Sequence, residues 1–292
     1  MKYLKMILTA LLSLLLCGCA PAGEPAQIAA TTLPVWEFTS RLCDGTPITV
    51  TRLVTEQVSC LHDYSLNVRQ VKAAESAETI VISGAGLEDF LDDLLINASV
   101  IDASEGIPLL CGEEHEEEHH HEEDHHHEED PHIWLSPVKA EAMVRNICTG
   151  LSARYPQYTQ VFQNNLILLI NDLDALARYG KDTLANLQCR ELITFHDGFS
   201  YFADAFGLSI VKAVEEESGS EASARDLIEL VTLVEGYGIP AVFTEVSGST
   251  SAAGIIARET GCSAFPLDMA MAGDSYFDAM YHNIDTIKEA LG

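Results

Sequence analysis

Hydrophobic and polar positions alternate along this chain in two blocks of similar design. In each block, short β-branched runs predict strands, and stretches with apolar residues at helical spacing predict the helices between them. The predicted strands are residues 28–33, 48–54, 79–83 and 99–102 in the first block, and 191–195, 208–212, 241–244 and 264–267 in the second. The predicted helices are residues 34–43, 66–77, 87–96, 136–153, 198–206, 223–236, 251–260 and 275–290.

This alternation is typical of mostly parallel sheets that are covered by helices. We therefore expect an α/β protein of two small lobes, residues 28–154 and 188–292, each with a four-stranded sheet. The stretch between them, residues 155–187, has no proline after Pro156 and one glycine, Gly180. It predicts a single long helix that joins the lobes stiffly. Because an interior glycine weakens a helix, two shorter helices broken near Gly180 are the alternative.

The first residues have the pattern of an export signal. Lys2 and Lys5 precede an apolar run, residues 6–17, which is shorter than the roughly 20 residues that a membrane-spanning helix needs. The run ends in Leu16-Cys17-Gly18-Cys19, which resembles a bacterial lipobox with Cys19 as the lipidated residue. We expect a signal peptide at 1–18, a lipidated tether at 19–27 and an extracytoplasmic protein anchored to the bacterial cell membrane. An ordinary cleaved signal is the alternative.

Charge narrows the possible ligands. Acidic residues outnumber basic ones by 45 to 16, which gives a net charge of −29. Such a chain is unsuited to nucleic acid and better suited to a cation. Residues 113–130 contain 11 acidic residues, no Lys or Arg, and seven histidines, which are His115, His119, His120, His121, His125, His126 and His127.

This segment, which we call the His/acid loop, has no apolar residue and cannot pack. We therefore expect it to be disordered and to offer weak auxiliary metal sites. A solvated acidic loop with incidental histidines is the alternative.

Four potential metal ligands follow predicted strands or begin the segments after them: His62, His132, His196 and Asp268. Ligands of open α/β sheets bind outside the carboxyl ends of the strands, so two such edges facing each other would bring the four together. Three imidazoles and one carboxylate suit Zn²⁺, which is bound tetrahedrally by N, O and S ligands. Glu245, directly after strand 241–244, is either a rival to Asp268 or a partner that orients a ligand.

Several segments, in order, resemble the zinc-specific substrate-binding proteins of ABC importers, of the ZnuA/AdcA type. The resemblance covers about residues 26–292. It rests on His62-Asp63-Tyr64, the Gly84-Ala85-Gly86-Leu87-Glu88 turn, the His/acid loop with Asp130-Pro131-His132-Ile133-Trp134-Leu135-Ser136-Pro137 after it, Phe195-His196-Asp197-Gly198-Phe199-Ser200-Tyr201-Phe202, Phe243-Thr244-Glu245, and Leu267-Asp268 followed by Tyr281-His282-Asn283-Ile284.

The resemblance implies two α/β lobes joined by one long helix, with the metal between the lobes. It makes His62, His132 and His196 the imidazole ligands and Asp268 the carboxylate. Manganese-binding relatives have Glu at the third position, so His196 favours zinc. The proline that commonly follows the fourth ligand is replaced by Met269, which leaves Glu245 or water as alternative fourth ligands.

We therefore expect a monomer that is not an enzyme: it captures Zn²⁺ with high affinity outside the membrane and delivers it to an ABC permease. A receptor for manganese or a broader range of divalent metals is the first alternative. A zinc hydrolase with Glu245 as general base is another, although no HExxH motif is present. The third is a surface adhesin in which the metal is only structural.

Overall fold

The computed structural model describes residues 27–58, 61, 64–96, 98–110, 129–214, 223–246, 248 and 250–292. The predicted signal peptide, Cys19, His62 and the seven histidines of the His/acid loop lie outside these residues. Among the residues that the structure describes, no helix is long and apolar enough to cross a membrane.

The N-terminal lobe is a four-stranded parallel sheet with the order β2-β1-β3-β4. Its strands are β1 (Gln27–Ala30), β2 (Thr49–Arg52), β3 (Thr79–Ile82) and β4 (Val100–Asp102). Its helices are α2 (Leu33–Cys43), α3 (Val68–Ser76), α4 (Asp92–Leu95) and α5 (Pro137–Arg154), with 3-10 turns η2 (Asp89–Leu91) and η3 (Ile133–Leu135).

The C-terminal lobe repeats the same arrangement with the order β6-β5-β7-β8, again parallel throughout. Its strands are β5 (Glu191–Thr194), β6 (Ser209–Ala213), β7 (Ala241–Glu245) and β8 (Ser263–Leu267). Its helices are α7 (Ser200–Phe206), α8 (Ala224–Tyr237), α9 (Ser251–Thr260) and α10 (Tyr276–Leu291). The predicted fold class is confirmed.

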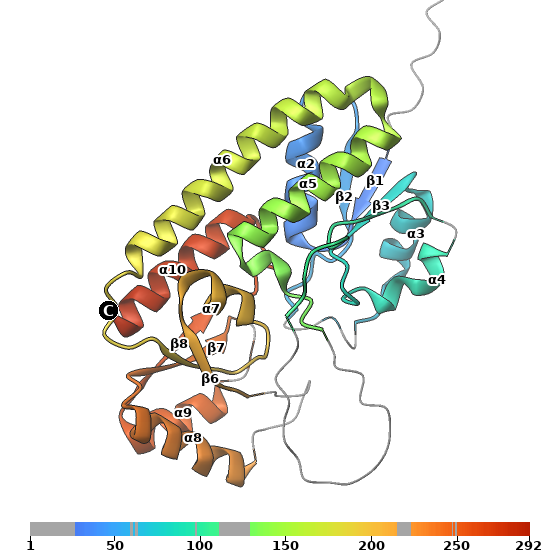
Figure 1. The fold of residues 1–292 in the computed structure, drawn as a ribbon. Coiled ribbons are helices and arrows are strands. Elements are labelled where there is room, and N and C mark those ends of the chain that lie inside the picture. Colours follow the sequence, from blue (N-terminus) through green and yellow to red (C-terminus); the bar gives the residue numbers. More distant parts are fainter. Residues whose placement is uncertain are drawn as a thin grey trace, which may run out of the picture.

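One long helix, α6 (Thr159–Thr183, 25 residues), runs along one side of both lobes after the 3-10 turn η4 (Pro156–Tyr158) (Figure 1). The helix is continuous through Gly180, so the broken alternative is wrong. Gly180 is required for packing: a Cβ there would lie 2.2 Å from the ring of Phe206 on α7. The predicted helix continued to Leu187, whereas α6 ends at Thr183.

The predicted helix 87–96 is also shorter than expected, because residues 89–91 form a 3-10 turn and only 92–95 are α-helical. Glu88 explains the late start. Its buried carboxylate turns back to accept hydrogen bonds from the backbone N–H groups of Ser83 (2.7 Å) and Gly84 (3.0 Å). This tertiary contact holds Glu88 outside helical geometry, at φ −107° and ψ 33°.

The largest cluster of buried apolar side chains spans both lobes. It extends from Ile28 in β1 to Leu291 at the end of α10 and includes the inward face of α6, while two smaller clusters each lie within one lobe. Trp134 is among its largest fully buried members.

A segment of the C-terminal lobe, residues 269–276, is bonded directly to the N-terminal lobe, and we call it the cross-lobe strap. Its carbonyls accept from the Trp134 indole (Met269, 2.7 Å), the Leu33 backbone (Met271, 3.1 Å) and the Arg52 guanidinium (Gly273, 2.7 Å). At its end, the Tyr276 hydroxyl donates to the Trp134 carbonyl at 2.7 Å. The strap begins one residue after Asp268, so that residue is held close to both lobes.

Candidate metal site

His132 lies where the chain, after β4, returns to the sheet edge and enters η3. Its side chain is 3% exposed. One oxygen of Asp130, Oδ1, accepts from the His132 backbone N–H at 2.9 Å and lies 2.8 Å from ring Nδ1. An ionised carboxylate only accepts hydrogen bonds, so Nδ1 carries the proton and the Nε2 lone pair points away from Asp130. The buried ring therefore presents one fixed metal-binding nitrogen.

His196 follows β5 through Phe195, and its side chain is 18% exposed. Its Nδ1 lies 3.3 Å from Oε1 of Glu245, the last residue of the neighbouring strand β7. This ion-pair contact is longer than the hydrogen bond between Asp130 and His132, and it likewise places a carboxylate beside the second ring nitrogen. Glu245 therefore lies beside the ring of a predicted ligand. This position fits one of the two roles expected for it, that of a partner that orients a ligand.

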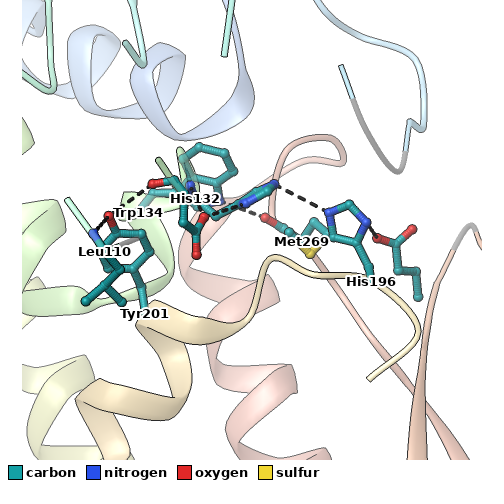
Figure 2. A network of polar contacts seen from close by, with 8 residues as sticks. Leu110, His132, Trp134, His196, Tyr201 and Met269 are labelled. Carbon is teal, nitrogen blue, oxygen red and sulfur yellow. Dashed lines mark hydrogen bonds and ion pairs between the residues drawn. The ribbon is translucent and has the colours of Figure 1, made fainter. Parts of the chain in front are cut away.

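The two imidazoles face each other across the lobe boundary, with 3.5 Å between their Nε2 atoms (Figure 2). Their rings are nearly perpendicular, at 87°, with centroids 5.3 Å apart. Two nitrogens bound to one tetrahedral zinc at about 2.0–2.1 Å lie about 3.3–3.4 Å apart. The spacing and the two outward lone pairs therefore fit a pair of zinc ligands.

Gly198 makes room for the His196 ring. A Cβ at this position would lie 2.7 Å from His196 Cδ2 and 2.6 Å from the methyl group of Met269. Such contacts are too close for any real side chain, so the ring needs a glycine two residues after it. In the sequence, Gly198 stands out only as part of the segment that begins at Phe195.

Asp268 follows β8 and lines a pocket between the lobes, beside Glu245 and Met269. Its Oδ1 accepts from the backbone N–H of Ala270 at 2.7 Å. Its own backbone is held by the side chain of Asn283 on α10, which accepts from the Asp268 N–H at 2.8 Å and donates to the carbonyl at 2.7 Å. Gln57 and Val58, at the start of the segment that continues to His62, form the N-terminal wall of the same pocket.

The structure thus brings two of the four predicted ligands into direct apposition, places Asp268 in the adjoining pocket, and does not describe His62. Within the described ranges, no three His, Cys, Asp or Glu side chains gather closely enough to hold a metal by themselves. Asp130 was missed as a functional residue, although a carboxylate two residues before a predicted ligand was a signal that could have identified it.

Comparison with known proteins shows the family. A family model described as "ZnuA: Zinc-uptake complex component A periplasmic" matches residues 28–290. The chain belongs to this family. Two solved members have the same fold. One, described as ZnuA, has a TM-score of 0.79 and 26% identity over 92% of this chain and 100% of its own. The other, the Zn(II)-bound ZnuA-like domain of Streptococcus pneumoniae AdcA, has a TM-score of 0.76 and 26% identity over 91% and 99%.

Curated relatives in the ZnuA family are named for zinc. The zinc-binding lipoprotein AdcA of Streptococcus pneumoniae serotype 4 is 31% identical over 99% of this chain and 61% of its own length. The high-affinity zinc uptake system protein ZnuA of Bacillus subtilis strain 168 is 28% identical over 92% and 88%. The chain therefore spans about three fifths of the AdcA relative and most of the ZnuA relative.

Proposed function

We propose that this chain captures Zn²⁺ outside the cytoplasmic membrane and delivers it to an ABC permease. The observation that carries the proposal is the pair of facing imidazoles, His132 and His196, each backed by a carboxylate. A carboxylate on the second ring nitrogen fixes the tautomer and raises the basicity of a zinc-binding histidine. Membership of the ZnuA family and the zinc in its members' names support the choice of cation.

The proposed ligand set is His62, His132, His196 and Asp268. All four are donors that zinc accepts, and a closed site of four protein ligands has no open position for a reacting water. Transport without turnover is therefore favoured over hydrolysis. The contact between Glu245 and the His196 ring argues in the same direction, because it assigns that carboxylate to orienting a ligand.

The proposed location is the outer face of the cell membrane, with the lipid on Cys19. The name of the pneumococcal relative, a zinc-binding lipoprotein, supports this anchor. Labelling cells with a palmitate analogue tests it: wild-type protein should incorporate the label, and C19A should not. Equal labelling of the two proteins would contradict the anchor.

The test of the site is titration of the metal-stripped protein with Zn²⁺, alone and in competition with Mn²⁺. We expect one tight zinc per chain and a clear preference over manganese. The binding free energy of a tight zinc site is about 10–16 kcal/mol, or about 2.5–4 kcal/mol for each of four ligands, so H132A, H196A and D268A should each weaken zinc binding by on the order of 100- to 1,000-fold.

The control variant is H282A. His282 lies on α10, where its ring is 3.5 Å from the Thr286 hydroxyl, and its loss should leave the zinc affinity unchanged. Deletion of residues 113–128 should also cost far less than any of the ligand variants. Wild-type affinity in H196A, or loss of tight binding on deletion of the loop alone, would contradict the assignment. A preference for manganese would favour the alternative receptor.

A further inference from the structure

A chain of polar contacts runs from a hydroxyl of the C-terminal lobe to the ring of His132 (Figure 2). The Tyr201 hydroxyl, on α7, donates to the Asp130 carbonyl at 3.0 Å and accepts from the Leu110 backbone N–H at 2.8 Å. Leu110 and Asp130 are also bonded to each other, N–H of Asp130 to carbonyl of Leu110, at 3.0 Å. One hydroxyl thus bridges the two backbone segments at which the His/acid loop leaves and rejoins the fold.

The next link is the Asp130 side chain. Its Oδ1 holds both the backbone N–H and the ring Nδ1 of His132. Tyr201, Asp130 and His132 are 1%, 8% and 3% exposed, so water does not compete for these contacts. Because hydrogen bonds to an ionised, buried group are strong and directional, the position of the Asp130 backbone determines the direction of the His132 ring.

The other carboxylate oxygen of Asp130, Oδ2, is buried and has no hydrogen-bond partner among the described residues. A buried carboxylate with one unsatisfied oxygen is costly and calls for an explanation. A divalent cation on the far nitrogen of His132 would favour the ionised form of this carboxylate through the ring, although it would not give Oδ2 a hydrogen bond.

Tyr201 also stands close in sequence to the second imidazole, five residues after His196. The same stretch of the C-terminal lobe therefore reaches His132 in two ways: directly, through the His196 ring, and indirectly, through Tyr201 and Asp130. If α7 moved away from the N-terminal lobe, both contacts would be lost together.

We infer that Asp130 is a positioning residue for His132 and that Tyr201 makes its hold depend on contact between the lobes. The inference rests on the proposed zinc-binding function. The chain from Tyr201 to His132 keeps zinc bound while the lobes are together, and it releases the orientation of His132 when they separate.

The test compares Y201F, D130N and D130A by zinc competition titration and by the rate of zinc dissociation. Removing a group that orients a metal-bound histidine costs about 10- to 100-fold in affinity. D130A should fall in that range. D130N keeps an acceptor for both N–H groups and should recover part of the loss. Y201F keeps the buried ring and should speed zinc release, by about tenfold.

Two further readouts separate positioning from simple destabilisation. The visible spectrum of bound Co²⁺ reports ligand geometry and should change in Y201F and D130N. Y179F is the matched control, because the Tyr179 hydroxyl donates at 2.6 Å to Asp285, away from the site; it should alter neither zinc release nor the cobalt spectrum. The double variant Y201F/D130A should lose little more affinity than D130A alone, because both act through one chain of contacts.

The outcomes are distinguishable. If the wild-type protein binds no zinc in the same titration, the proposed function fails. If wild-type protein binds zinc and Y201F and D130N match it in affinity, release rate and cobalt spectrum, only the present inference is overturned. Fully additive losses in the double variant would overturn the role of Tyr201 as the support of Asp130.

Discussion

The two sheets have the same strand order, but the buried carboxylates at their carboxyl ends have different roles. In each lobe a buried carboxylate sits at the end of the central strands. In the N-terminal lobe it is Glu88, which accepts from the Thr31 hydroxyl at 2.6 Å and from the N–H groups of Ser83 and Gly84. In the C-terminal lobe it is Glu245, which contacts the His196 ring.

One layout therefore serves two purposes. In the N-terminal lobe the carboxylate closes a backbone turn, and the edge of the central strands carries hydroxyls and no described histidine. The N-terminal imidazole comes instead from beyond β4, and it needs its own carboxylate, Asp130. In the C-terminal lobe the central strands supply both the ligand and its support. The predictions below test this division between the two carboxylates.

Among the variants that test this comparison, E245Q should weaken zinc binding most. The amide keeps an acceptor for the His196 ring but loses the negative charge, so zinc affinity should fall by about 10- to 100-fold. E88Q is the matched control and should bind zinc as the wild type does. Titration of both variants with a competing chelator measures the contrast. Equal losses would remove the distinction, and a loss beyond about 1,000-fold in E245Q would make Glu245 the fourth ligand.

The next effect concerns the space that His196 occupies. In G198A the added methyl would meet the His196 ring and Met269, so the ring must shift by several tenths of an ångström, and zinc affinity should fall about tenfold. G254A, on α9, is the control, because a Cβ there meets nothing within 4 Å. Isothermal titration and the melting temperature separate the effects. Unchanged zinc affinity in G198A would show that the ring is not confined.

Substitution of Glu88 should have the smallest effect on zinc affinity and the clearest effect on the free energy of unfolding. Burial raises the pKa of Glu88 to about 7, against the lowering effect of its three hydrogen bonds and with a further rise from nearby Asp102. The folded state therefore holds a proton that the unfolded chain, with a Glu pKa of about 4.3, gives up. Stability from this group is present below pH 4 and is lost as the pH rises to 7, by up to about 3 kcal/mol.

E88Q cannot ionise at this position. The unfolding free energy of the wild type minus that of E88Q should therefore fall as the pH rises from 5 to 8. Urea unfolding of the metal-stripped proteins at four pH values measures it, and groups common to both cancel. A difference that is independent of pH would mean that Glu88 is ionised in the folded state throughout this range.

Local sequence patterns were enough for much of the fold. All eight strands were predicted, because β-branched runs such as Thr79–Ile82 carry their signal locally. Errors occurred where distant contacts decide. Glu88 accepts a hydrogen bond from Thr31, 57 residues earlier, and the helix after it starts late; the interior Gly180 of α6 is explained only by Phe206, 26 residues further along the chain.

The candidate site shows the same limit. Its ligand types and their places after strands could be read from the sequence, since parallel strands expose their carboxyl ends at one edge. The contacts that orient those ligands could not be predicted from the sequence. Nothing near Tyr201 in the sequence indicates that its hydroxyl bridges Leu110 and Asp130, because that contact exists only once the two lobes have met.

The cross-lobe strap has a consequence for how the two lobes are completed. Trp134 receives its hydroxyl partner from Tyr276, 142 residues later. Without the strap, the Trp134 carbonyl and the Trp134 indole N–H would both lose their hydrogen-bond partners, so the N-terminal lobe completes this part of its interior only together with the C-terminal lobe. The two lobes are therefore separate in architecture but complete their hydrogen bonding together.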